Sequence, residues 1–140
     1  MSDDEAAIED VVRAFFSAFV SGPECIERLA ALRELFVPGA LVVRTCGMEP
    51  AIYSVDEFIA PRQELLMSGK LVDFKEWAED GRIDLFGDIA HWFGGYAKDG
   101  LQDGTPYAGR GMKSIQFIRT PEGWRITAAA WDDERPGVSR

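Results

Sequence analysis

The sequence lacks several residue types on which particular sites depend. It contains no asparagine, one histidine and two cysteines among 140 residues. Without asparagine there is no N-glycosylation sequon, and the only side-chain amides are those of three glutamines. Cys25 and Cys46 are too few to indicate a disulfide framework in a chain that can form its own core, so we expect reduced thiols. No cysteine or histidine spacing typical of a metal site occurs, and we expect neither a metal nor a cofactor.

An excess of positive charge and a long apolar run are also missing. Lys and Arg number 15 against 24 Asp and Glu, which gives a net charge of -9. Phosphate backbones and anionic membranes would be repelled, so we expect neither a nucleic acid nor a membrane as partner. No apolar run approaches the roughly 18 residues of a membrane span. The acidic Met1–Glu5 does not resemble a basic secretory leader, and we therefore expect a cytoplasmic protein.

The composition that is present is typical of an ordinary globular protein. Apolar residues make up 46% of the chain and charged residues 28%. A chain of this length buries about two-thirds of its unfolded surface when it folds. We therefore expect a single domain over residues 1–140, with no internal repeat and no low-complexity segment.

The first part of the chain predicts two helices followed by a strand. Ser2 and Glu5 form a capping box, which begins a helix expected to end near Val20. Its apolar residues recur every three or four positions, as on one face of a helix: Ile8, Val12, Phe15 and Phe19. A second, shorter helix is expected between Gly22-Pro23 and Pro38-Gly39, directing inward Ile26, Leu29, Leu32 and Phe36. The β-branched segment Ala40–Cys46 then predicts a strand.

A third helix is expected before the pattern changes. Ser54 and Glu57 form a second capping box, which predicts a helix from Val55 to about Met67. Pro61 lies inside this segment, where a proline removes a helical hydrogen bond. We therefore expect either a kink or a short turn followed by a new helix that begins at Pro61.

The second half of the chain predicts antiparallel strands separated by turn signals. Gly87-Asp88 and Pro121–Gly123 read as tight hairpins, and Asp99–Gly109 as a longer flexible loop. A bulge is expected near Asp80-Gly81. The expected strands are Leu71–Phe86, Ile89–Lys98, Gly111–Arg119 and Trp124–Trp131. Helices followed by a long sheet predict an α+β fold in which a strongly curved antiparallel sheet wraps around the N-terminal helices.

This order of elements resembles the nuclear transport factor 2-like superfamily, also called SnoaL-like or ketosteroid-isomerase-like. The resemblance covers nearly the whole chain and includes four local segments: Phe58-Ile-Ala-Pro-Arg62, Phe86-Gly-Asp-Ile-Ala90, Arg110-Gly-Met-Lys-Ser-Ile-Gln116 and Gly123-Trp-Arg-Ile126. The closing segment Trp131–Pro136 is similar to the end of uncharacterised bacterial members. The resemblance implies a cystatin-like cone with a mostly apolar pocket at its wide mouth, and a homodimer joined through the outer face of the sheet. It does not imply one activity, because the superfamily includes isomerases, dehydratases, cyclases and binding proteins.

The best-known chemistry of this superfamily does not carry over to the present residues. The position of the general base in ketosteroid isomerase falls near Arg44, which cannot abstract a proton at neutral pH. The position of its oxyanion tyrosine falls on Phe15, which has no hydroxyl group, and that of its protonated aspartic acid falls near Ser114 or Gln116. Scytalone dehydratase uses a pair of histidines, whereas this chain has one. Neither reaction is therefore expected by the known mechanism.

Asp132 and His91 are the two candidate catalytic bases. Asp132 is in phase with Trp124 and Ile126, and would point toward the pocket mouth if those residues line the concave face. A desolvated carboxylate could act as a base, but we expect instead that Asp132 ends a strand in solvent and pairs with Arg135 or a neighbouring chain. His91 could transfer protons near pH 7, or it could lie on the outer face of the sheet. Strand alternation places it opposite Trp92 and Tyr96, so both sets cannot face the pocket without a bulge.

Arg44, Tyr53, Tyr96 and Gln116 are the candidate ligand-binding residues. Arg44 shares a strand face with two apolar residues, so it would form an internal ion pair, remain exposed, or anchor an acidic ligand. Tyr53, Tyr96 and Gln116 could orient a carbonyl group or satisfy backbone groups. The tryptophans are expected to fill the core and the interfaces.

Three hypotheses for function follow. The first is a homodimer whose pocket binds a small, partly apolar and possibly acidic molecule without chemistry of its own. The second is a cofactor-independent isomerase, dehydratase or hydrolase that uses Asp132 or His91 as base, with Arg44 or Tyr96 stabilising negative charge. This second hypothesis requires Asp132 to lie within hydrogen-bond reach of a cavity that Arg44 or Tyr96 also lines. The third is an interaction role through the outer face of the sheet.

Overall fold

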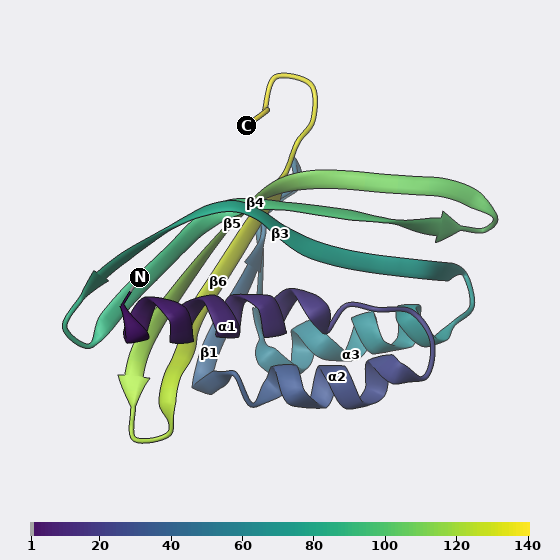
Figure 1. Cartoon of the computed structure of the whole chain (residues 1–140). Helices are drawn as coiled ribbons and strands as arrows, with labels where there is room; N and C mark the ends of the chain where they lie inside the picture. The colour runs from purple at the N-terminus through teal and green to yellow at the C-terminus, as the bar shows by residue number, and fades with distance from the viewer. Residues whose placement is uncertain (1) are drawn as a thin grey trace.

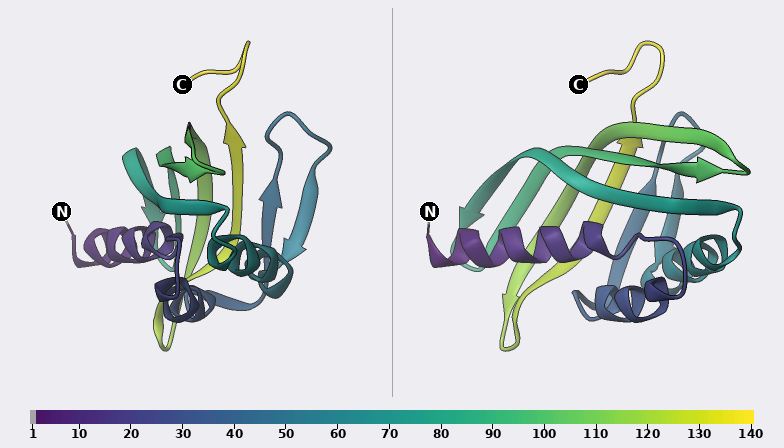
Figure 2. Two further views of the ribbon diagram at one scale, coloured as in Figure 1. Left: turned by 90° about the vertical axis from the view of Figure 1, so that its right-hand side faces the viewer. Right: turned by 45° about the vertical axis from the view of Figure 1, so that its right-hand side comes forward.

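The computed structural model describes residues 2–140, and in that range it has three helices packed on one side of a curled six-stranded sheet (Figure 1). The helices are α1 (Asp3–Ser17), α2 (Glu24–Arg33) and α3 (Val55–Met67). The strands are β1 (Phe36–Arg44), β2 (Ala51–Ser54), β3 (Leu71–Phe86), β4 (Ile89–Gln102), β5 (Thr105–Thr120) and β6 (Gly123–Asp133). Two further views show the sheet curving around the helices (Figure 2). The predicted α+β fold with a curved sheet is confirmed.

The strand order is β2-β1-β6-β5-β4-β3, with every neighbouring pair antiparallel except β1 and β6. This parallel pair joins the N-terminal part of the chain to its last strand, with Val42 opposite Ala129. The helices α1, α2 and α3 fall on the concave side, and their apolar residues form one core cluster with the inward side chains of the sheet. Among residues 2–140, no helix is both long and apolar enough to cross a membrane.

Both predicted capping boxes are present. The hydroxyl oxygen of Ser2 accepts a hydrogen bond from the Glu5 amide, and that of Ser54 accepts one from the Glu57 amide. The helix α1 buries Ile8, Val12 and Phe15, as its apolar spacing predicted. It ends at Ser17, three residues before the expected position, so the buried Phe19 lies in the connection that follows.

The second helix differs from the prediction in which face it buries. Cys25, Leu29 and Leu32 point inward, whereas Ile26 is 46% exposed. The helix also ends at Arg33, and Phe36 reaches the core from the beginning of β1. The row of buried residues on α2 therefore begins at Cys25, four residues before Leu29. A spacing of four is as typical of one helix face as the spacing of three between Ile26 and Leu29, so the sequence pattern fits both alternatives.

The helix α3 has the predicted bounds and continues through Pro61 without a second helix beginning there. The alternative of a turn and a new helix is therefore wrong. Pro61 is exposed at the surface of α3, and Phe58, Ile59 and Leu66 supply the buried contacts that hold the helix against the sheet.

The expected loop Asp99–Gly109 is not present, because β4 and β5 continue through it as a long hairpin. The two strands turn at Asp103 and Gly104, which both have positive φ, as a two-residue hairpin turn of type I′ requires. β6 ends opposite Gly111, so the first residues of β5 lie at a sheet edge. An edge strand tolerates Pro106, since the missing N–H is not needed by a neighbour.

The strand pairing of residues 2–140 shifts register at four places, and two of these bear on the predictions from the sequence. The shift in β3 between Ala78 and Gly81 confirms the expected bulge. Gly81 and Gly94 allow the indole of Trp92 to lie against the backbone, because a Cβ at either position would come within 2.4 Å of that ring. A second shift lies in β6, where Gln116 pairs with Ala128 and Phe117 pairs with Ile126. Thr127 is therefore an extra residue without a partner on β5. Before this bulge the side chains of Trp124 and Ile126 point inward, and after it the alternation is shifted by one residue, so that Ala129 points inward.

Candidate functional site

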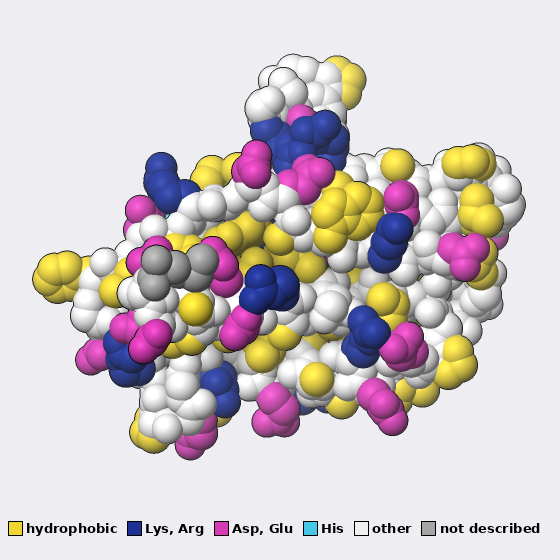
Figure 3. Space-filling view, in the orientation of Figure 1, with side chains coloured by type: hydrophobic (Ala, Val, Ile, Leu, Met, Phe, Trp, Pro, Cys, Tyr) yellow, Lys and Arg dark blue, Asp and Glu magenta, His cyan; other side chains and the backbone are white. Residues whose placement is uncertain are grey.

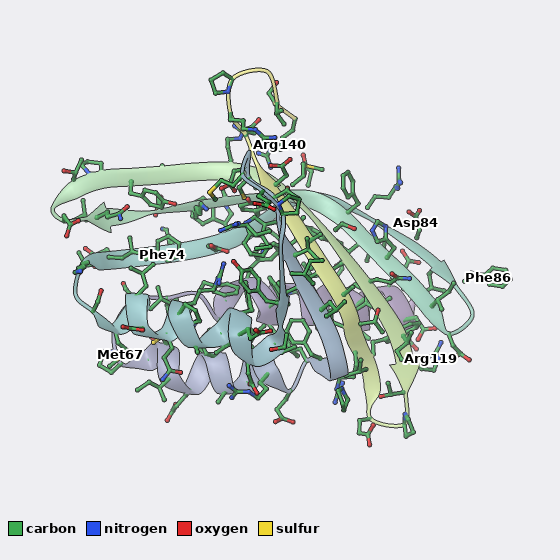
Figure 4. The ribbon with its side chains drawn as sticks, turned by 180° about the vertical axis from the view of Figure 1, so that it is seen from behind. Met67, Phe74, Asp84, Phe86, Arg119 and Arg140 are labelled. Atoms are coloured by element: carbon green, nitrogen blue, oxygen red, sulfur yellow. The ribbon has the colours of Figure 1, made fainter. Side chains whose placement is uncertain are left out.

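A cavity of about 410 Å³ lies between the concave face of the sheet and α3. Exposed lining residues from α3 and β4, among them Leu65 and Gln102, place its opening at the wide end of the cone. Figure 4 shows Phe74 and Met67 at this end of the molecule, opposite Phe86 and Arg119. The lining residues are Phe19, Arg44, Tyr53, Phe58, Pro61, Arg62, Leu65, Leu66, Leu71, Phe74, Glu76, Tyr96, Lys98, Gln102, Tyr107, Lys113 and Trp131.

Positive charge predominates in this lining although the chain as a whole is acidic. Four cationic side chains and one carboxylate face the cavity: Arg44, Arg62, Lys98, Lys113 and Glu76. On the face of the molecule shown in Figure 3, by contrast, acidic and basic side chains are interspersed. A cavity that concentrates cations in a protein of net charge -9 is suited to an anion.

Lys113 is the most deeply buried of these cations, with 4% exposure. Strand alternation places it on the inner face of β5 with Ile115 and Phe117. None of the ion pairs among residues 2–140 includes Lys113. Burial lowers its pKa to about 8, although Glu76 acts in the opposite direction. The Nζ atom lies 4.5 to 5.8 Å from the centres of five aromatic rings: Phe15, Phe16, Phe19, Tyr96 and Trp131.

Arg62 is held on α3 in a fixed orientation. Its Nη1 donates a hydrogen bond of 3.0 Å to the carbonyl oxygen of Phe58, one helical turn earlier. The guanidinium carbon lies 3.9 Å from the centre of the Phe58 ring and 5.2 Å from that of Trp131. Stacking on aromatic rings leaves the edge of the guanidinium free to donate into the cavity. Burial lowers the pKa of Arg62, but an arginine remains charged at physiological pH.

Among residues 2–140, Glu76 is the only carboxylate in the cavity lining. Burial raises its pKa, although Lys113, Lys98 and Arg62 act in the opposite direction. No ion pair among the described residues includes it. A desolvated carboxyl group of this kind can hold a proton at a pH where an exposed glutamate cannot.

Tyr96, Lys98 and Asp133 form a polar group at one wall. The hydroxyl of Tyr96 donates a hydrogen bond to the carboxylate of Asp133, and Lys98 Nζ lies 3.6 Å from the other oxygen. Burial and this hydrogen bond raise the pKa of Tyr96. Burial acts to lower the pKa of Lys98, but Asp133 and Tyr107 together raise it. The hydroxyl proton of Tyr96 is therefore used in the hydrogen bond to Asp133, and the positive charge of Lys98 is partly neutralised by the same carboxylate.

Arg44 and Tyr53 line the cavity from the two strands nearest α3. Arg44 donates through Nη2 to the carbonyl oxygen of Glu49 at 3.3 Å. Its Nε is buried and has no hydrogen-bond partner among the described residues. Arg44 has no ion pair among residues 2–140 and is half-buried, so neither an internal ion pair nor full exposure describes it.

The structure does not bring Asp132 or His91 into the cavity lining. The extra residue at Thr127 shifts the phase of β6, so Asp132 lies on the opposite face from Trp131 and pairs with Arg135. The hydrogen bond from Arg135 holds the pKa of Asp132 below its usual range. His91 lies on the outer face, where its Nε2 is 2.7 Å from the Ser114 hydroxyl oxygen.

Gln116 is also outside the cavity, exposed opposite His91 on the outer face of the sheet. Of the six predicted site residues, Arg44, Tyr53 and Tyr96 line the cavity. The expectation that Asp132 continues the inward phase of Trp124 and Ile126 is wrong, because the bulge in β6 intervenes.

Sequence reasoning did not single out Arg62, Glu76, Lys98 or Lys113, which carry most of the charge in the cavity. Of these four, Lys113 has a local signal. Lys113 alternates with Ile115 and Phe117, and a charged residue on an apolar strand face is unusual unless it serves a site. Among residues 2–140, no group of three or more His, Cys, Asp or Glu side chains could hold a metal ion.

Comparison with known proteins identifies the fold. No family model matches the chain, and no curated protein matches it. A solved NTF2-like protein with a cystatin-like fold from Novosphingobium aromaticivorans superposes with a TM-score of 0.75 at 17% identity, over 98% of this chain and 85% of the other. An uncharacterised protein with a cystatin-like fold from Caulobacter vibrioides gives 0.71 at 14% identity, over 96% and 92%.

A protein from Streptomyces avermitilis, provisionally assigned as a dehydratase of the NTF2-like family, gives a TM-score of 0.72 at 15% identity, over 95% of this chain and 96% of the other. Identities of this size show the fold and not the activity. The chain therefore has the cystatin-like fold of nuclear transport factor 2-like proteins, as the resemblance of its sequence predicted.

Proposed function

We propose that the protein binds a small organic anion, a monocarboxylate with an apolar body, in the cavity of the cone. The observation that carries this proposal is the uncompensated positive charge in the lining. Lys113 is buried without an ion-pair partner, and Arg44 has a buried Nε without a hydrogen-bond partner, both among the described residues. Burying a charge without a partner is costly, and a carboxylate would supply the missing partner.

The remaining lining suits the apolar part of such a ligand. Phe19, Phe58 and Phe74 face the cavity together with leucines of α3 and β3. A site of about 410 Å³ lies in the lower part of the usual range for small-molecule pockets. With about 30 Å³ for each water-sized group, it accepts a ligand of roughly a dozen non-hydrogen atoms. An aryl-substituted or medium-chain carboxylic acid fits this description.

Calorimetric titration at pH 7 tests the proposal. The probes are phenylacetate, 3-phenylpropionate and hexanoate, each compared with its neutral amide. We expect at least one acid to bind and its amide to bind at least tenfold more weakly, because a hydrogen bond to a charged group contributes about 1.5–3 kcal/mol. The substitution Arg62→Met should weaken the binding of the acid by a similar factor. Arg82→Met, which removes an exposed arginine of β3, is the matched control.

Two results would contradict this proposal. If the amides bind as tightly as their acids, the negative charge of the ligand does not contribute to binding. If the Arg62→Met variant binds the acid as tightly as the unaltered protein, Arg62 does not bind the carboxylate. The alternative that Asp132 or His91 acts as a general base has no support from geometry, since neither lies in the cavity lining.

We also propose that two copies of the chain associate through the outer face of the sheet. Ile89 and Phe93 are 54% and 44% exposed on β4, with Phe86 83% exposed at the adjoining turn. Exposed apolar side chains grouped on one face are typical of an interface. Light scattering should give the mass of a dimer, and Phe93→Asp should shift it toward the monomer. A monomer at micromolar concentration would refute the proposal.

A further inference from the structure

The amine of Lys113 is held differently from those of the other three lysines. The chain has only Lys70, Lys75, Lys98 and Lys113. Lys70 and Lys75 are exposed, and Lys98 faces Asp133 at 3.6 Å. Lys113 faces five aromatic rings and the cavity, without an ion pair among the described residues. An ion pair keeps a lysine protonated, and Lys113 has none.

A neutral amine is therefore available at Lys113 near physiological pH. Burial lowers its pKa to about 8, and the charged groups of the neighbouring elements act on it in both directions. Glu76 of β3 and Asp133 of β6 raise the pKa, whereas Arg62 of α3 and Lys98 of β4 lower it. At pH 7 roughly one molecule in ten carries the neutral amine, against roughly one in 3,000 for a lysine of ordinary pKa. Lysines desolvated in this way act as nucleophiles toward carbonyl carbons.

The same cavity holds a cation for a carboxylate and a group that can deliver a proton. The Arg62 guanidinium and Lys113 Nζ lie 5.2 and 5.3 Å from the centre of the same Trp131 ring, so they are at most about 10.5 Å apart, the sum of those distances. Glu76 lines the cavity with both, and burial favours its protonated form. All three groups line the same cavity, so a small molecule bound there lies close to each of them.

We propose that the ligand of this cavity is an oxo acid and that Lys113 condenses with its carbonyl carbon to form an iminium ion, while Arg62 holds its carboxylate. This inference rests on the proposed function, because it assigns a chemical class to the anion bound there. It also assigns a reactive group to the cavity, since neither Asp132 nor His91 lies in its lining.

The step balances as an ordinary condensation. The lone pair of neutral Nζ attacks the carbonyl carbon, and the C=O electron pair moves to oxygen. Transfer of one proton from nitrogen to that oxygen gives a carbinolamine. Glu76 then protonates the hydroxyl group, which leaves as water, and the nitrogen lone pair forms the C=N bond. The products are an iminium cation, one water molecule and the Glu76 carboxylate, which then lies in the same cavity as the new positive charge.

Trapping with sodium cyanoborohydride tests the inference on the full chain. The probes are phenylpyruvate and 4-oxopentanoate, with 3-phenylpropionate as the acid that has no ketone group. The reagent reduces an iminium ion to a stable secondary amine, so intact mass measurement counts the adducts and peptide mapping locates them. We expect one adduct at Lys113, forming at least ten times faster at pH 7.5 than adducts at Lys70 or Lys75. The rate should rise with pH up to about 8.

Variants separate the roles of the two groups. Lys113→Met should abolish the adduct, and Glu76→Gln should slow its formation at least tenfold while leaving it at Lys113. Lys75→Met is the control and should change nothing. Mapping on the unaltered protein needs no variant, so the test holds even if a substitution impairs folding.

The outcomes distinguish this inference from the proposed function. Adducts spread equally over all four lysines, or adducts confined to the N-terminal amine, would overturn it. If calorimetry shows that phenylpyruvate binds but no adduct forms, the iminium is refuted and anion binding stands. If neither oxo acids nor plain acids bind, the proposed function fails and the inference fails with it.

Discussion

Replacing Lys113 by methionine should stabilise the folded protein at pH 7. Methionine has a similar length and no charge, so it fills the same space among the aromatic rings. The reason for the gain is the cost of holding an ammonium group at 4% exposure without an ion-pair partner among the described residues. Burial lowers the pKa of Lys113 from 10.5 to about 8, and this difference measures the cost.

The magnitude follows from the two pKa values. At about 1.4 kcal/mol for each tenfold change, the ammonium costs the folded state about 3 kcal/mol. Attraction between the cation and the surrounding rings offsets about 1–2 kcal/mol of this. The net gain expected for Lys113→Met is therefore about 1–2 kcal/mol. Because the folded-state pKa lies below the unfolded-state value, the cost is complete below pH 8 and disappears as the pH rises through 10.5.

Urea unfolding of both proteins at pH 7 and at pH 10 measures the effect. The gain from Lys113→Met should be largest at pH 7 and smaller at pH 10, whereas Lys70→Met, at an exposed position, should change the unfolding free energy by less than about 0.5 kcal/mol at either pH. A loss of stability at pH 7 would show that Lys113 is stabilised as a cation, and a gain independent of pH would show that folding does not lower its pKa. Either result would refute the inference that Lys113 carries a neutral amine near physiological pH.

Three further predictions concern the scaffold. Arg119 holds the pKa of Asp4 at about 2, so Arg119→Ala should lower the melting temperature at pH 6, and the difference should vanish as the pH falls through about 2. Gly111→Ala should cost more than about 2 kcal/mol in urea unfolding, because its Cβ would lie 2.3 Å from the carbonyl oxygen of Asp132. Ser54→Ala removes the cap of α3 and should cost about 1 kcal/mol, measured in the same way, with no change in the fold by circular dichroism.

Local signals were sufficient for most elements because capping and turn chemistry depend on neighbouring residues. The capping box at Ser54 and Glu57 predicted the beginning of α3, and the turn at Gly87-Asp88 predicted the hairpin that joins β3 and β4. The same reasoning could have found the turn at Asp103-Gly104, since Asp-Gly is a strong hairpin signal. It failed over Asp99–Gly109 because glycine and proline also occur in edge strands.

The position of a side chain relative to the cavity depends on pairing that local patterns do not contain. One extra residue at Thr127 reverses the phase of β6, which excludes Asp132 from the lining and directs Trp131 into it. No period in the sequence of β6 marks that bulge, because it arises from the register with β5.

The sequence by itself determined the order of the three helices and the long strands and the acidic character of the chain, because these depend on neighbouring residues and on composition. Only the tertiary structure decided that Arg62, Glu76 and Lys113 meet in one cavity, since they come from three separate elements. The lowered pKa of Lys113 also depends on the tertiary structure, because desolvation is caused by every group that packs around the amine and not by its neighbours in the chain.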